Sequence, residues 1–438
     1  MSLISFPRLF AYGILGLPLA MAALPIYVHV PKFYSDLGLD LAAVGGLLLV
    51  ARLADALIDP LLGLWSDRAR GFAYGRLWFI GSGVPLLALG MLALFNPLVG
   101  PAHLALWLML SLSIVYLGFS MATVSYQAYG AELSADIHER TRITAVREGL
   151  SVVGVLLAAA LPEIFARQSG VREGFAQFAW LFAPMAIGCC AIMLLLSPRP
   201  PAYTKPRHEN IGLVENLLAP FGNRPFRFLL VAFLLNGIAA AIPATLVLFF
   251  VQDIIGRSDL SAAFLITYFL AGAVGMPFWV WLARRLGKRA AWLAGMGLSI
   301  LSFVWAFTLA RGDVTPFILI CVLSGLGLGA DLALPPSMLA DVIDRDEMQG
   351  KPRNEGAYFG LWNLVTKLNL ALAAGIALPL LGRLGYVPNA IEASAYSLTA
   401  LAAIYALLPS LLKICAAAML MFVPQTIAAP RALTMMHS

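Results

Sequence analysis

The sequence has 438 residues, of which 61% are hydrophobic and 12% are charged, and its mean hydropathy is +0.86. Soluble domains carry about 25% charged residues, so this composition excludes an ordinary soluble protein and predicts a polytopic membrane protein. The basic residues behind the net charge of +6 are distributed as expected of loops beside a membrane. The charge therefore gives no reason to expect a nucleic-acid partner.

Twelve apolar segments are long enough to cross a bilayer as helices, which takes about 20 residues each. Their residues are continuously apolar rather than alternating, which favours helices over a membrane barrel. We therefore predict an all-α membrane protein with twelve transmembrane helices in two six-helix, pseudo-symmetric halves. The predicted spans are 9–33, 41–64, 76–97, 102–131, 143–166, 175–197, 224–251, 261–283, 290–310, 315–340, 355–382 and 394–422.

A polar connection at 198–223, rich in proline and charge, separates an N-terminal half at 1–197 from a C-terminal half at 224–438. Of the 29 Lys and Arg residues, 20 fall in the termini and the loops on the same side as this connection. Six fall on the other side and three lie inside predicted spans. Basic loops stay in the cytoplasm, so we expect a multi-pass protein of the cell (inner) membrane with both termini cytoplasmic.

The two halves repeat one motif at matching positions. The fourth span ends in Ala135-Asp136 and the tenth in Ala340-Asp341. The same charged residues then follow, Arg140 and Glu148 in the first half and Arg345 and Glu355 in the second. A duplicated chain with a central loop is typical of a transporter whose substrate binds near the mid-membrane level between the halves.

Three charges in the second predicted span, Arg52, Asp55 and Asp59, fall on one helical face at i, i+3 and i+7. A charge at mid-membrane costs roughly 2.5–3.5 kcal/mol on insertion scales, so this face must line a bundle interior or a watered cavity. Two carboxylates one turn apart repel unless a proton or cation neutralises them, which indicates a cation-coupling site. The alternative is a structural charge network with Arg52 and Lys367.

Three stretches resemble the glycoside–pentoside–hexuronide:cation symporters of the major facilitator superfamily, the melibiose-permease group. They are RLADALIDPLLGLWSDRAR (52–70), YQAYGAELSADIHERTRITAVR (126–147) and MLADVIDRDEMQGKPRNEGAYFGLWNLVTKLNLAL (338–372). The resemblance implies the major facilitator fold and the joint movement of a cation and a solute by alternating access.

The resemblance also implies roles for single residues. Asp55 and Asp59 match the acids of the cation site, and Ser120 falls where the family has a hydroxyl ligand. Lys367 matches an in-membrane lysine linked to that site, and Arg147 lies near an arginine that helps to bind the sugar.

The chain departs from the melibiose-permease pattern at three positions. Members of that group hold sugar hydroxyls with an Asp in span one and another in span four, where this chain has Pro18 and Thr123. A side-chain amide beside the second cation-site acid is replaced by Ile58. A site without its hydroxyl acceptors loses much of its preference for polyols, so symport of a lysolipid on the same scaffold stays open.

Polar and aromatic side chains within the spans are candidates for the substrate site, and hydrogen bonding between helices is the alternative role for each. These candidates are Thr123, Tyr126, Gln127, Arg147, Asn236, Asp331, Tyr358, Trp362 and Asn363. Charged residues near the loops are candidates for a gate of ion pairs that break when that face opens. They are Asp67, Arg68, Arg76, Glu139, Arg140, Asp344 and Arg345.

We predict secondary symport of a small organic solute, a sugar or glycoside being one candidate, by a monomer in the bilayer. Symport or flipping of a lysolipid or other amphipath is the alternative. A membrane enzyme is a remote alternative, because the sequence offers no nucleophile–base pair, metal-ligand set or phosphate loop. We expect no cofactor beyond a coupling ion, either Na+ or H+ at Asp55 and Asp59. The proton is favoured because Na+ needs a shell of several oxygen ligands and Ile58 removes one of them.

Overall fold

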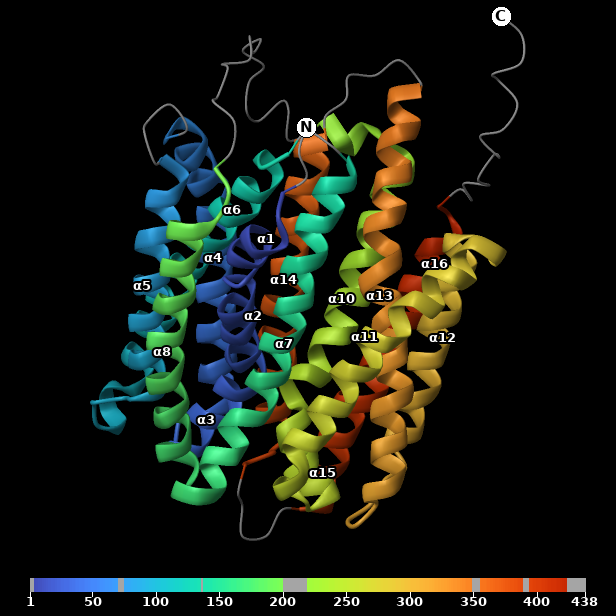
Figure 1. The fold of residues 1–438 in the computed structure, drawn as a ribbon. Helices are drawn as coiled ribbons and strands as arrows, with labels where there is room; N and C mark the ends of the chain where they lie inside the picture. The colour runs from blue at the N-terminus through green and yellow to red at the C-terminus, as the bar shows by residue number, and fades with distance from the viewer. Residues whose placement is uncertain are drawn as a thin grey trace, which may run out of the picture.

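The computed structural model describes residues 4–69, 75–134, 137–199, 219–348, 355–388 and 394–423. All regular structure in these ranges is helical, and twelve helical runs are long and apolar enough to cross a membrane. The predicted all-α membrane fold is confirmed. Helix α1 begins toward the face at which α16 ends, which we call the terminal face; the other is the opposite face (Figure 1).

The first span is interrupted at a proline. It consists of α1 (Phe6–Gly13), α2 (Gly16–Leu24), the π-helical turn η1 (Pro25–His29) and α3 (Val30–Asp36). Pro25 has no N–H to donate and its ring crowds the preceding turn, so the helix widens there instead of continuing as a regular α-helix.

The other spans of the N-terminal half are nearly continuous helices. They are α4 (Leu41–Ala69), α5 (Gly75–Phe95), the 3₁₀ turn η2 (Pro101–His103) with α6 (Leu104–Glu132), α7 (Ile137–Ser169) and α8 (Val171–Leu196). Residues 200–218, most of the predicted central loop, lie outside the described residues, so the domain boundaries stay a prediction.

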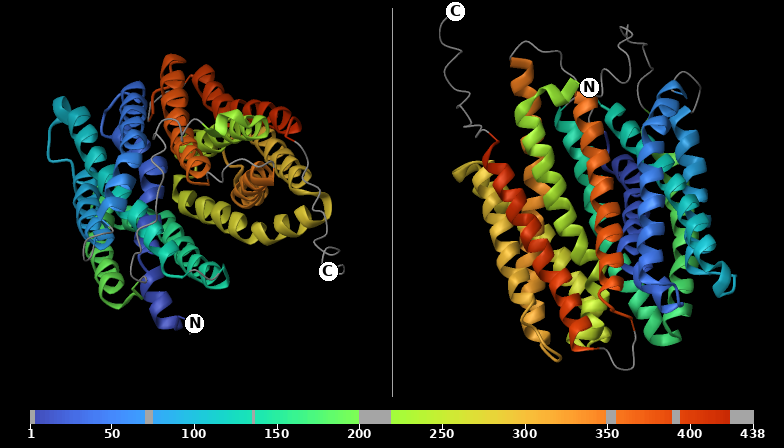
Figure 2. Two further views of the ribbon diagram at one scale, coloured as in Figure 1. Left: turned by 90° about the horizontal axis from the view of Figure 1, so that it is seen from above. Right: turned by 180° about the vertical axis from the view of Figure 1, so that it is seen from behind.

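The C-terminal half supplies the remaining six spans. They are α10 (Arg224–Phe250) with η4 (Val251–Ile255), α11 (Ser261–Leu286), α12 (Lys288–Ala306), α13 (Val314–Met348), α14 (Glu355–Arg383), and α15 (Ala395–Ala402) joined by η6 (Ala403–Leu407) to α16 (Leu408–Met421). Short 3₁₀ turns, η3 (Ala219–Gly222) and η5 (Ser258–Leu260), precede α10 and α11. Seen from above, α13 lies inside a ring formed with α10, α11 and α12 (Figure 2).

The two halves meet along two helix pairs, α4 with α14 and α7 with α11. The first pair lies at the centre of the view from behind (Figure 2). Small residues let these backbones approach, because a Cβ added to Gly45 of α4 would lie 2.9 Å from the carbonyl oxygen of Ala374 in α14. This close contact positions side chains of α4 against side chains of α14.

Apolar packing also joins the two halves toward the opposite face. One buried apolar cluster includes Tyr34 of α3 and Phe249 of α10, whereas a second cluster, around Trp292, belongs to the C-terminal half alone. The Lys32 ammonium lies 5.9 Å from the centre of the Phe249 ring, across the boundary between the halves. These contacts join α3 to α10 across the boundary between the halves.

Candidate ion-coupling site

Helix α4 carries the charged stripe that the sequence predicts. Its first turn is capped by Asp40, whose carboxylate accepts hydrogen bonds from the N–H groups of Ala42 and Ala43 at 2.9 and 3.2 Å. Asp55 is buried, with 6% of its surface exposed, and the Asp59 side chain is 21% exposed. The stripe faces α6 and α14, because these helices supply its partners.

Four of the five predicted cation-site residues form one cluster. Lys367 of α14 donates through Nζ to Asp55 Oδ2 at 2.7 Å and also forms an ion pair with Asp59. Ser120 of α6 donates to Asp55 Oδ1 at 2.6 Å and accepts a hydrogen bond from Lys367 Nζ at 3.0 Å. Residues more than 300 positions apart in the chain, Asp55 and Lys367, are thereby brought together.

Counted without the neighbouring Arg52, the four residues of the cluster have an excess of negative charge when their groups carry their ordinary charges. Two carboxylates share the single ammonium of Lys367. In addition, Asp59 Oδ1 is buried and has no hydrogen-bond partner among the described residues. An unsatisfied buried carboxylate oxygen is costly, so this position is suited to a proton or a small cation.

The oxygen atoms of Asp55, Asp59 and Ser120 are the hard ligands that an alkali cation requires. In the described part of the chain, this cluster included, no group of three or more His, Cys, Asp or Glu side chains could hold a metal ion. Lys367 Nζ lies between the two carboxylates, so an incoming cation would have to compete with this ammonium.

Arg52, the fifth predicted residue, is buried but has a different neighbour. Its guanidinium lies 5.5 Å from the centre of the Tyr116 ring in α6, a cation–π contact. Arg52 therefore adds positive charge beside the cluster while its guanidinium stacks on an aromatic ring.

Two predicted substrate-binding residues belong to a separate cluster inside the C-terminal half. Lys413 of α16 donates to Asp331 Oδ2 and to Asn236 Oδ1, each at 2.8 Å. Trp292 Nε1 donates to Asp331 Oδ1 at 2.8 Å. In the sequence, Lys413 is a lone charge in an apolar span. A charge in such a span needs a buried partner, and this need was the available signal for Asp331.

The candidates on α6 and α7 divide between buried and exposed positions. Tyr126 donates to the carbonyl oxygen of Tyr12 at 2.9 Å, and the Thr123 hydroxyl is buried without a partner among the described residues. Gln127 is exposed, and Arg147 donates to the adjacent Glu148 at 2.6 Å. Thr123 and Gln127 thus have hydrogen-bonding capacity available for a solute.

Two candidates on α14 pack against α10. The Trp362 ring stacks on Phe233 with ring centres 3.7 Å apart, and Tyr358 Oη accepts a hydrogen bond from Asn223 Nδ2 at 3.3 Å. Asn363, on the next position of α14, is exposed.

Two of the predicted gate residues, Arg76 and Glu139, form ion pairs near the terminal face. Arg76 donates through Nε to Glu132 at 2.9 Å and through Nη1 to Ser66 at 3.0 Å. Glu139 forms an ion pair with Arg142. The side chains of Asp67, Arg68, Arg140 and Asp344 lie outside the described residues.

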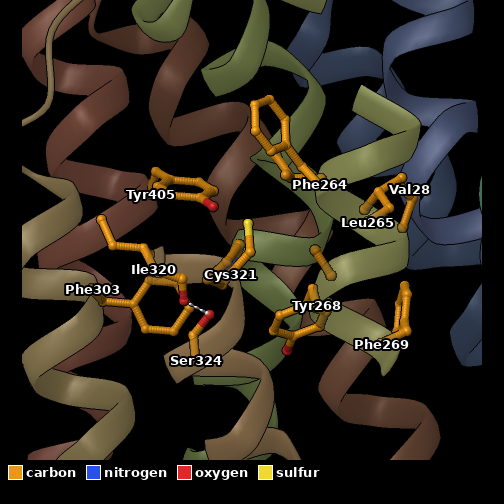
Figure 3. Close-up of a pocket in the computed structure, with 13 residues that line it drawn as sticks. Val28, Phe264, Leu265, Tyr268, Phe269, Phe303, Ile320, Cys321, Ser324 and Tyr405 are labelled. Carbon is orange, nitrogen blue, oxygen red and sulfur yellow. Dashed lines mark hydrogen bonds between the residues drawn. The ribbon is translucent and has the colours of Figure 1, made fainter. Parts of the chain in front are cut away.

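An apolar cavity lies in the C-terminal half beside the boundary with the first span. Phe264, Tyr268, Cys321 and Tyr405 line it, and Val28 is its contribution from the N-terminal half (Figure 3). Its free volume is about 40 Å³, enough for the end of an apolar group but not for a whole chain. The Ser324 hydroxyl on its wall donates to the carbonyl oxygen of Ile320 in its own helix, at 2.6 Å.

Twelve transmembrane helices in two packed groups, with a charged cluster where the groups meet, define a membrane transporter of the major facilitator type. The chain belongs to the MFS/sugar transport protein family, whose sequence profile matches residues 9–426. The resemblance seen in the sequence is thereby confirmed.

Most of the curated relatives that match the chain are named as symporters. The uncharacterized symporter YjmB of Bacillus subtilis is 23% identical over 398 residues, which cover 88% of this chain and 84% of that protein. The human sodium-dependent lysophosphatidylcholine symporter 1 is 25% identical over 376 residues, 78% of this chain and 68% of the relative. The crystal structure of the nucleoside transporter NupG has a TM-score of 0.71 at 14% identity, covering 95% and 99% of the two chains, which shows a shared fold.

Proposed function

We propose that the protein is a cation-coupled symporter of an organic solute and that Asp55, Asp59, Ser120 and Lys367 bind the coupling ion. The observation that supports this is the charge imbalance: two carboxylates share one ammonium, and Asp59 Oδ1 has no partner among the described residues. The solute leaves chemically unchanged, as the transporter family suggests.

The cluster also explains how ion binding could drive alternating access. Both acids belong to the N-terminal half, whereas Lys367 belongs to the C-terminal half. A cation bound to the acids weakens the attraction of Lys367 to them, and this ion pair links the two halves. Binding of the ion therefore changes the relative stability of the conformations that keep or separate the pair.

We expect the coupling ion to be a proton. Lys367 Nζ already lies between the carboxylates, so protonation of one acid leaves the ammonium paired with the other. Na+ would instead have to replace the ammonium and would need further oxygen ligands. In membrane vesicles, an imposed proton gradient should drive solute accumulation at constant Na+. A Na+ gradient with the proton gradient collapsed should not. Accumulation driven by Na+ alone would overturn the proton assignment while leaving the site itself in place.

For the solute, an amphipath is favoured over a simple sugar. Pro18 and Thr123 occupy the positions where the melibiose-permease group has its sugar-binding acids, and the cavity beside Val28 has apolar walls. A relative is named for transport of a lysophospholipid. These observations together support an amphipathic solute.

We expect a lysophospholipid to raise the melting temperature of the protein in nanodiscs and a simple galactoside to leave it unchanged. With Pro18 and Thr123 in place of the two sugar-binding acids, a galactoside would lose two charge-assisted hydrogen bonds. This loss costs roughly 3 kcal/mol or more, which lowers the affinity at least about a hundredfold. The same headgroup without its acyl chain is the matched control. Micromolar binding of a galactoside would contradict this assignment.

We also propose that the terminal face is cytoplasmic, because the basic loops of the sequence connect helices at that face. Cysteine labelling can test this in sealed cells. A cysteine replacing Ser258, in η5 at the opposite face, should react with an impermeant reagent from outside, and a cysteine replacing Ser2 should not. Labelling of both positions would contradict the proposed orientation.

A further inference from the structure

A second pocket, of about 580 Å³, lies at the terminal face between the ends of α11, α12 and α13. It is separate from the ion-coupling site, whose residues do not line it. Among the described residues that line it, the basic side chains are those of Arg284, Arg285, Lys288, Arg289 and Arg345, and Asp341 is the acidic one. The pocket therefore carries a strong excess of positive charge.

The described residues neutralise little of this charge. Lys288 Nζ donates to both carboxylate oxygens of Asp341 at 2.7 Å, so the acid of the pocket is already occupied. Arg289 donates through Nη1 to the carbonyl oxygen of Val423 at 2.9 Å, while its Nε is buried without a partner in the described part of the chain. Arg284 makes no ion pair with any described side chain.

The shape of the pocket suits a phosphate group. Gly287 adopts φ +87°, which forms the tight corner between α11 and α12, and as the N-cap residue it has no side chain with which to cap the first turn of α12. The N–H groups of that first turn and the positive end of the helix dipole thus face the same region as the arginines. Val280, Leu334 and Met338 provide apolar wall below the charges.

The surface next to the pocket is typical of a lipid-facing helix near the headgroups. Val274, Phe278 and Trp281 follow one face of α11 and are 67%, 50% and 50% exposed. The guanidinium of Arg285 lies 5.3 Å from the Trp281 ring, at the end of this apolar stripe. Aromatic and basic side chains in this arrangement are typical of a membrane interface.

We propose that this pocket binds the phosphate headgroup of an anionic phospholipid from the surrounding bilayer, with the acyl chains along the exposed face of α11. Basic pockets between transmembrane helices bind anionic headgroups in this way. A soluble phosphate shares the charge but has no use for the apolar stripe that leads away from the pocket. The proposal stands independently of the coupling ion and the transported solute.

The test uses the full-length protein in nanodiscs of phosphatidylcholine with or without phosphatidylglycerol. Phosphatidylglycerol should raise the melting temperature by several degrees, and native mass spectrometry should find it retained on the protein. Arg284→Gln/Arg285→Gln should lose both effects, whereas Arg284→Lys/Arg285→Lys, which keeps the charge, should retain most of them. Arg227→Gln removes an exposed arginine of α10 near the same face but outside the pocket, and it should behave as the wild type.

Inorganic phosphate added to phosphatidylcholine nanodiscs distinguishes a soluble phosphate from a lipid headgroup as the bound phosphate group. It should not raise the melting temperature. If it reproduces the full effect of the lipid, the pocket is a soluble-phosphate site and the lipid proposal is wrong. An unchanged response of Arg284→Gln/Arg285→Gln to phosphatidylglycerol would equally overturn it.

Discussion

Asp59→Asn is expected to abolish accumulation of the solute while leaving exchange of solute across the membrane. The neutral amide resembles a permanently protonated carboxylate, so the transporter can still change conformation with solute bound but no longer carries an ion. A potential of 100 mV is worth about 2.3 kcal/mol per charge, which supports roughly 50-fold accumulation of a neutral solute. The variant should fall to an accumulation ratio of about one, where no work is done on the solute.

Asp55→Asn tests the other acid of the cluster. Asp55 accepts hydrogen bonds from Ser120 and Lys367, so its replacement should also abolish accumulation and should weaken the link between the halves. Asp259→Asn is the matched control, because its side chain is 53% exposed in a surface ion pair with Arg257. If both Asp55→Asn and Asp59→Asn accumulate solute as the wild type does, the cluster is not the coupling site.

The twelve spans could be predicted from the sequence because each is a long apolar segment, and the bilayer tolerates no lipid-exposed structure with unsatisfied backbone groups. The i, i+3, i+7 spacing of Arg52, Asp55 and Asp59 likewise fixes their face on α4, because helical periodicity alone determines it. Span ends differ from the prediction by a few residues, since polar residues such as Asp36 can extend a helix beyond its apolar part.

Contacts between helices could not be derived in the same way. Nothing in the local pattern shows that Lys413 of α16 reaches Asp331 of α13 and Asn236 of α10, because that depends on how three helices are rotated against one another. The family resemblance linked Lys367 to the acids of α4, and it carried no equivalent information for Lys413. Sequence reasoning therefore left two roles open for Asp331 and Asn236, binding of the solute and hydrogen bonding between helices, and it did not identify their partner.

The two buried lysine clusters differ in a way that indicates different roles. The Lys367 cluster has two acids for one ammonium and a carboxylate oxygen without a described partner. In the Lys413 cluster one acid balances one ammonium, and Asp331 Oδ1 and Oδ2 each accept a hydrogen bond. The first arrangement leaves room for a change of charge, whereas the second is complete and favours a fixed structural link between α10, α12, α13 and α16.

We therefore expect Lys413→Met to destabilise the protein strongly, by about 3 kcal/mol or more, because it leaves the buried Asp331 carboxylate without its counter-charge. The melting temperature of the purified protein should fall, and Asp331→Asn alone should lower it as well by leaving a buried ammonium. The double variant Asp331→Asn/Lys413→Met removes both charges and keeps an acceptor for Trp292 Nε1. It should be more stable than the sum of the single effects predicts.

Arg257→Met is the matched control for Lys413→Met, since Arg257 is 45% exposed and its ion pair with Asp259 lies at the surface, where solvent screens the charges. Its melting temperature should stay close to that of the wild type. The structural role of Lys413 would be contradicted by additive losses in the double variant. A Lys413→Met protein that melts normally but no longer binds solute would instead place Asp331 and Asn236 in the substrate site, as the sequence alone suggested.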